Sequence, residues 1–126
     1  MVDIIKNIIP HYEGLSYLDA ENSGEGTLIS VSVDYIDTTF FNEEQYNKWV
    51  NMLDSIEVIR PTFQIYCSYD TSGYQYWKDI MEESNHTYID IWISDNFNDN
   101  DIIPLINELD IIVEKFDKFF DENFVD

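Results

Sequence analysis

Residues 100–126 of this chain read NDIIPLINELDIIVEKFDKFFDENFVD, and their pattern predicts one long helix with two unlike faces. Apolar side chains recur at alternating steps of three and four residues, which is the spacing of one face of an α-helix. Pro104 fits such a helix only within its first turn. We expect the following apolar stripe to lie on the hydrophobic core: Ile102, Leu105, Leu109, Ile112, Phe116 and Phe119.

The same segment carries a row of carboxylates on another face. Asp110, Glu114, Asp117 and Asp121 follow one another at steps of four, three and four residues. At a rise of about 1.5 Å per residue, neighbours in this row stand roughly 4.5–6 Å apart. Like charges at that spacing weaken a helix by about a few tenths of a kcal/mol per pair. A row held in this way can imitate the phosphates of a nucleic-acid strand.

Upstream of this helix, segments that alternate apolar and polar side chains predict strands with one buried face. They cover residues 27–35, 63–69 and 88–93, and a short strand at 15–19 would form a hairpin with the first of them across a glycine-bearing turn at 20–26. Shorter helices are predicted at 2–11 and 74–83. We therefore expect one α+β domain over residues 1–126. It would have a small mixed sheet of three to four strands, helices mainly on one face and the long amphipathic C-terminal helix. A compact α/β sandwich is the alternative.

A further helix has the clearest start signal in the sequence. Asn42 suits the N-cap position, and Gln45 three residues later completes a capping box. Phe41 and Tyr46 stand at the positions of a hydrophobic staple. The pair Arg60-Pro61 closes the segment, because the residue before a proline leaves the helical region.

Charge is the most unusual property of the composition. The chain has 26 Asp and Glu against 6 Lys and Arg, which gives a formal net charge of −20. Such a field disfavours direct binding to DNA, RNA or an anionic membrane, and it attracts basic surfaces, among them the nucleic-acid-binding surfaces of other proteins. A surface that served solubility alone would mix the two signs of charge. Adaptation to high salt is an alternative explanation for the negative charge, but the many large aromatic residues argue against it.

Catalytic and metal-binding patterns are absent from the sequence, so we expect no enzyme, no cofactor and no dedicated metal site. Asp95, Asp99 and Asp101 lie close together in DNFNDND (residues 95–101), and their oxygen ligands suit calcium. An EF-hand starting at Asp95 would, however, place Phe97 at a ligand position and Asn100 where glycine is needed. Weak calcium binding by this stretch stays open.

The single cysteine, Cys67, excludes an internal disulfide framework and favours a reducing compartment. It falls on the apolar face of a predicted strand, where a buried structural thiol is expected rather than a nucleophile. No apolar run approaches the length of a membrane span, and the first residues do not read as a signal peptide. We therefore expect a cytoplasmic protein.

Tyr66, Tyr88 and Trp92 are predicted to share the outward face of the sheet. Platforms that stack nucleic-acid bases place such aromatic residues beside Lys and Arg, whereas the neighbours here include Asp70 and Asp90. The simplest expectation is that another element of the chain covers these three aromatic side chains. If the three side chains are exposed, they suit a protein interface better than nucleic acid.

These observations favour a small stoichiometric inhibitor that mimics DNA and blocks a basic nucleic-acid-binding protein, such as a CRISPR effector, a restriction enzyme or a repair enzyme. An immunity protein that neutralises a basic nuclease toxin is the alternative, with Tyr66, Tyr74, Tyr76, Trp77 and Trp92 as added anchors. An acidic adaptor domain is the third. The acid-rich stretch from Glu13 to Glu44 is a candidate second flank. The candidate partner-binding residues are Tyr66, Tyr88, Trp92, Asp95, Asp99, Asp101, Asp110, Glu114, Asp117 and Asp121.

Overall fold

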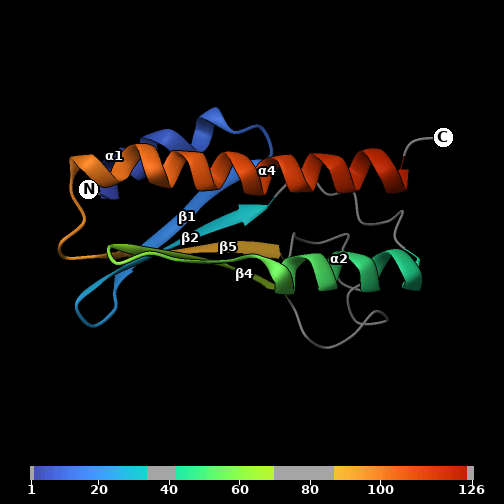
Figure 1. Cartoon of the computed structure of the whole chain (residues 1–126), viewed down its shortest axis with the longest axis horizontal. Helices are drawn as coiled ribbons and strands as arrows, with labels where there is room; N and C mark the ends of the chain where they lie inside the picture. The colour runs from blue at the N-terminus through green and yellow to red at the C-terminus, as the bar shows by residue number, and fades with distance from the viewer. Residues whose placement is uncertain (1, 34–41, 70–86, 125–126) are drawn as a thin grey trace.

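The computed structural model describes residues 2–33, 42–69 and 87–124 of the chain. A curved sheet forms the centre of the molecule, and the long C-terminal helix crosses it from end to end (Figure 1). In chain order the elements are α1 (Val2–Ile8), the 3-10 turn η1 (Ile9–His11), β1 (Leu15–Asn22), β2 (Gly26–Val33), α2 (Glu43–Ser55), β3 (Glu57–Ile59), β4 (Phe63–Tyr69), β5 (Thr87–Ser94), the 3-10 turn η3 (Asp99–Asp101) and α4 (Ile102–Phe124).

The sheet has five strands in the order β1-β2-β5-β4-β3, and every neighbouring pair is antiparallel. The predicted α+β class is confirmed. The prediction of a mixed sheet with three to four strands is wrong, because the strands are all antiparallel and there are five of them. Strand β3 was missed because its three residues follow α2 after Ile56 alone and are too few to show alternation. Strand direction depends on which distant segments pair, and the alternation within one strand does not encode that choice.

Alternation did place the buried face correctly. Ile29 of β2 and Ile65 of β4 both stand opposite Ile91 of β5, and all three side chains are fully buried. The hairpin of β1 and β2 is also confirmed, although β1 runs three residues beyond the predicted end at Asp19. A register shift between Tyr17 and Asp19 interrupts the alternation there, which is why the sequence pattern ended early.

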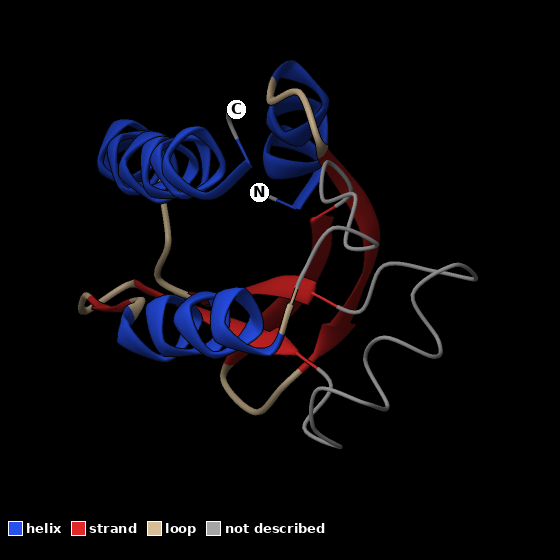
Figure 2. Cartoon of the chain, turned by 90° about the vertical axis from the view of Figure 1, so that its right-hand side faces the viewer, coloured by secondary structure: helices blue, strands red, loops and turns tan. Residues whose placement is uncertain are grey.

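The helices lie on one face of the sheet, inside its curvature (Figure 2). The apolar stripe predicted on the C-terminal helix is the face of α4 that enters the core, where Leu105, Leu109, Ile112, Phe116 and Phe119 are buried and Ile102 is partly buried. The fully buried Trp49 of α2 joins the two helices, because its ring centroid lies 5.3 Å from that of Phe116 and 5.1 Å from that of Phe119.

Both helix starts follow local chemistry. The capping box before α2 is confirmed: the Gln45 amide donates to Asn42 Oδ1 at 2.8 Å, and the Asn42 amide donates to Gln45 Oε1 at 3.2 Å. Pro104 lies in the first turn of α4, where a missing N–H costs nothing. The N-terminal helix is shorter than predicted, since α1 ends at Ile8 and η1 continues to His11.

The predicted helix at 74–83 and the staple residue Phe41 lie outside the described residues. Within the part of the chain that the structure describes, no helix combines the length and apolar character that a membrane crossing requires.

Candidate interaction surface

The outer face of α4, turned away from the core, carries the four carboxylates of the predicted row. Asp110, Glu114, Asp117 and Asp121 are all exposed, while the buried stripe occupies the other side of the same helix. The row spans roughly 16 Å along the helix axis. We call these four residues the α4 acidic row.

The segment after η1 adds a fifth carboxylate beside this row. Tyr12 donates its hydroxyl hydrogen to Asp110 Oδ1 at 2.6 Å, which ties the segment to α4. Glu13 and Asp117 line one hollow of about 410 Å³ together with His11, Tyr12 and Val113. Gly14 then takes a positive φ of 87°, which lets the chain turn into β1. The sequence pattern had placed Glu13 in a separate acidic stretch, because contacts between residues so far apart in the chain leave no local signal.

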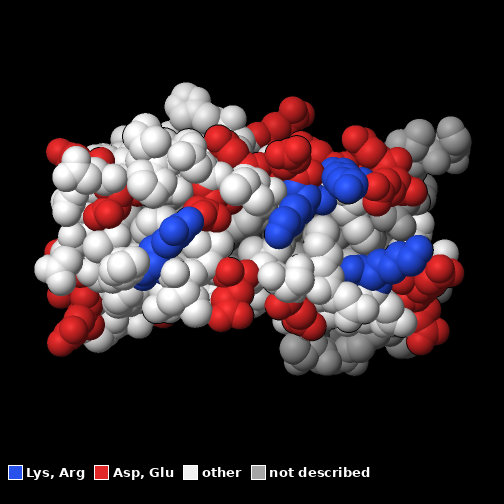
Figure 3. Space-filling view, viewed as in Figure 1, with Lys and Arg blue, Asp and Glu red and all other residues white. Residues whose placement is uncertain are grey.

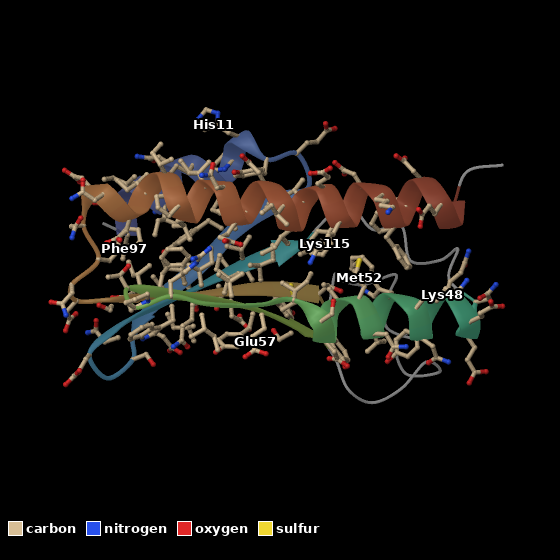
Figure 4. The ribbon with its side chains drawn as sticks, viewed as in Figure 1. His11, Lys48, Met52, Glu57, Phe97 and Lys115 are labelled. Carbon is tan, nitrogen blue, oxygen red and sulfur yellow. The ribbon has the colours of Figure 1, made fainter. Side chains whose placement is uncertain are left out.

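Three of the described cations pair with carboxylates outside the α4 acidic row. Lys118 nevertheless lies beside the row, four residues after Glu114 and three residues before Asp121. Lys48 pairs with Glu44 at 3.4 Å, Lys118 with Glu122 at 3.9 Å, and Arg60 Nη2 lies 2.6 Å from Glu108 Oε1. Figure 4 shows Lys115 extending from α4 toward Met52 of α2, while His11 lies beyond the opposite side of α4. On the face drawn in Figure 3, acidic atoms gather along the upper margin right of centre, over α4; one group of basic atoms lies among them and the others lie below. Within the described ranges, no salt bridge neutralises a carboxylate of the α4 acidic row.

Two side chains near these charges have raised pKa values. Burial, and then the hydrogen bond to Asp110, raise the pKa of Tyr12 well above its ordinary value. Burial, with a smaller effect from the negative charge of Asp90, raises the pKa of the Cys67 thiol to about 12. Cys67 therefore stays protonated at neutral pH and is a poor nucleophile.

The carboxylates of the 95–101 loop lie at the N-terminal end of α4. Asp101 caps the turn η3, because its Oδ2 accepts a hydrogen bond from the Asn98 amide at 2.9 Å. Asp95 and Asp99 are exposed. Among residues 2–33, 42–69 and 87–124, no group of three His, Cys, Asp or Glu side chains is arranged to hold a metal ion.

Tyr66, Tyr88 and Trp92 share the outer face of the sheet, as the alternation predicted. Tyr88 stands opposite Ser68, and Trp92 stands opposite Gln64, in the pairing of β5 with β4. This face points away from the helices, so the aromatic residues and the α4 acidic row lie on opposite sides of the molecule (Figure 2). The ten candidate partner-binding residues therefore do not form one surface.

Trp92 has a structural role in the hairpin. A Cβ atom added to Gly26 would lie 2.8 Å from the Trp92 ring and 2.3 Å from the Ile93 carbonyl oxygen, so the ring lies directly against the bare glycine backbone. Its indole N–H also donates to the Ser23 carbonyl at 3.4 Å. The hydroxyl of Tyr66, on the same sheet face, donates to Gln64 Oε1 at 3.1 Å.

In comparisons with known proteins, no family model, no curated protein and no solved structure matches this chain.

Proposed function

We propose that this protein is a stoichiometric inhibitor whose outer α4 face imitates a nucleic-acid strand and blocks a basic nucleic-acid-binding protein. The α4 acidic row, extended by Glu13, is the observation on which this function rests. It is a line of exposed carboxylates on one helix, and none of the described salt bridges involves it. Inhibition would be steric and electrostatic, with fast association that weakens as salt is added.

The α4 acidic row carries less charge per unit length than one strand of DNA. The row presents one carboxylate per roughly 5.5 Å of helix axis. One strand of B-DNA carries a phosphate about every 3.4 Å. The net charge of −20 adds a long-range field to this line, and that field steers the protein toward a cationic groove. The mimic thus combines a local line of charge with the attraction of the whole molecule.

The row makes little contribution to folding. Like charges at steps of three and four residues destabilise a helix. Such charges can be retained where they serve a purpose other than stability. Asp110 alone among the four forms a described hydrogen bond to another part of the chain, from Tyr12. A surface that costs stability and makes few contacts with the rest of the chain is a good candidate for binding.

The immunity-protein alternative needs aromatic anchors next to the acidic contact. Tyr66 and Trp92 lie across the molecule from the α4 acidic row, and Tyr74, Tyr76 and Trp77 lie outside the described residues. No described feature brings an aromatic side chain of that set to the row, so this alternative has less support than the mimic. The adaptor hypothesis makes no use of the row at all.

The test compares two variants with equal net charge. In the first, the row is neutralised by Asp110→Asn, Glu114→Gln, Asp117→Asn and Asp121→Asn. In the second, four exposed carboxylates of β1, the β1–β2 turn and β3 are neutralised by Asp19→Asn, Glu21→Gln, Glu25→Gln and Glu57→Gln. Proteins captured from cells of the source on the wild type are identified, and the inhibition of their nucleic-acid binding is titrated with each variant.

We expect the first variant to lose inhibition by a factor of about 100 and the second to retain it within about threefold, since a close, desolvated charge pair contributes about 1–3 kcal/mol. Excess duplex should also displace the wild type. Equal losses in both variants would contradict a specific role for α4, and retention of inhibition against excess duplex would contradict mimicry.

A further inference from the structure

The outer face of α4 exposes two large apolar side chains beside its carboxylates. Ile103 is 64% exposed and Ile111 is 48% exposed, and neither belongs to the buried core or to the apolar residues packed against it. Isoleucine is a weaker helix former than Leu, Glu or Lys, because its branched Cβ loses rotamer freedom against the preceding turn. These residues therefore serve neither the core nor the helix.

Both isoleucines are placed on the same side of α4 as the charges. Ile103 lies seven residues before Asp110, which puts the two side chains on nearly the same line along the helix. Ile111 directly follows Asp110 and lies on the flank of the row that also carries Lys115 and Lys118, four and seven residues later. From Ile103 to Asp121 this mixed apolar and acidic face is roughly 27 Å long.

Two exposed isoleucines beside the acidic row offer a partner apolar contacts as well as carboxylates. Nucleic acid and a second copy of this chain are both repelled by the net charge of −20. An extended, straight helix face pairs best with another helix, whose side chains can interdigitate with it at about 8–10 Å between axes. Basic helices are also the elements by which many proteins enter the major groove of DNA.

We propose that the outer face of α4 docks an amphipathic basic helix of the partner protein. The apolar residues of that helix would contact Ile103 and Ile111, and its Lys and Arg side chains would pair with the α4 acidic row. This inference rests on the proposed function, which requires only a basic groove, and goes beyond it by naming the element that α4 meets.

Two synthetic peptides test it with the full-length chain. Each has about 18 residues, since a helix of this length spans the face. In the first, Leu recurs at helical spacing and Lys fills the other positions; the second has the same composition in an order that destroys the apolar face. Binding of each labelled peptide is measured by fluorescence anisotropy at roughly 0.05 and 0.5 M NaCl.

Each variant of a pair replaces two exposed apolar side chains by Gln. Ile103→Gln with Ile111→Gln removes the apolar contacts, and Ile4→Gln with Leu18→Gln removes two exposed apolar side chains elsewhere, which are 38% and 50% exposed. Gln is a good helix former, so α4 keeps its structure. The variant with the neutralised row, described above, reports the electrostatic part.

We expect the wild type to bind the amphipathic peptide about tenfold more tightly than the reordered one, because two partly exposed isoleucines become buried. The Ile103 and Ile111 substitutions should abolish this preference without changing the salt dependence, and the control pair should keep it. Equal affinity for both peptides, or a preference that survives in the Ile103 and Ile111 variant, overturns the inference. If neutralising the α4 acidic row changes the affinity for neither peptide, the proposed function fails as well.

Discussion

The outer face of α4 and the outer face of the sheet both meet solvent, and both carry residues that the sequence suggested for binding. Their chemistry differs. On the sheet, the Trp92 ring lies against Gly26 and its indole N–H donates to Ser23, so the aromatic side chain holds the hairpin. On α4, Glu114, Asp117 and Asp121 accept no described hydrogen bond, and the row pairs with no described cation.

The comparison teaches that exposure and residue type alone do not identify a binding residue. A partly buried tryptophan that packs on a bare glycine is explained by the fold. A line of carboxylates that repel one another is not explained by the fold, and it is therefore the better candidate for function. The two faces should respond to mutation in opposite ways, and the following measurements test that contrast.

The largest effect is expected at Gly26. Gly26→Ala would place a Cβ atom 2.3 Å from the Ile93 carbonyl oxygen and 2.8 Å from the Trp92 ring, so a central strand pair must shift. We expect the free energy of unfolding to fall by about 3 kcal/mol, as in other overpacked sites. Urea denaturation measures this, and an unchanged midpoint would show that Trp92 does not lie on Gly26.

Removal of the ring itself should cost less. Trp92→Ala deletes a partly buried aromatic side chain and its hydrogen bond to Ser23, and we expect a loss of about 2 kcal/mol in the free energy of unfolding. The same variant should keep the inhibition carried by α4. If Trp92→Ala left stability intact and abolished inhibition, the sheet face would be the binding surface.

Neutralising the α4 acidic row should raise the stability of the protein, whereas the two previous substitutions should lower it. The three neighbouring pairs Asp110–Glu114, Glu114–Asp117 and Asp117–Asp121 repel one another, so their removal should raise the free energy of unfolding by about 1 kcal/mol at low salt. Screening should erase most of that gain at high salt. Denaturation at both salt concentrations checks this, and a variant less stable than the wild type would indicate a structural role for the row.

The smallest effect concerns the Tyr12–Asp110 hydrogen bond. Tyr12→Phe should lower the free energy of unfolding by about 0.5 kcal/mol near neutral pH, since the bond is partly exposed. Because the pKa of Tyr12 is raised from 10.0 in the folded protein, the folded state holds more protons above that pH, and stability falls as the pH rises further.

Tyr12→Phe should therefore flatten the decline in stability above about pH 10. Tyr69, which donates to Asp54 and whose pKa is raised by burial to about 12, accounts for a remaining slope. Unfolding curves for the two proteins across this range provide the measurement. Parallel declines would mean that Tyr12 ionises with equal ease in the folded and unfolded states.

Local patterns predicted the elements well and their assembly less well. The step of three and four residues from Leu105 to Phe119 identified the buried face of α4, and the capping box at Asn42 identified the start of α2. The bulge in β1 and the three-residue β3 gave no periodic signal. The antiparallel arrangement arises from pairing between β2 and β5, which are distant in the chain.

The same distinction applies to the candidate site. Helical spacing was sufficient to predict that Asp110, Glu114, Asp117 and Asp121 share one face. Nothing in the sequence indicated that Glu13 would join them or that Trp92 would lie across the molecule, because both facts depend on how the elements pack. Ile103 and Ile111 became distinctive only when their exposure was known.

The central claim is that the α4 acidic row, and not the net charge in general, engages the partner. The most direct measurement is the slope of the logarithm of the association constant against the logarithm of salt concentration for the captured partner. We expect the variant with the neutralised row to show a much shallower slope than the wild type, and the charge-matched variant of the sheet side to keep the wild-type slope. Identical slopes for the two variants would contradict the claim.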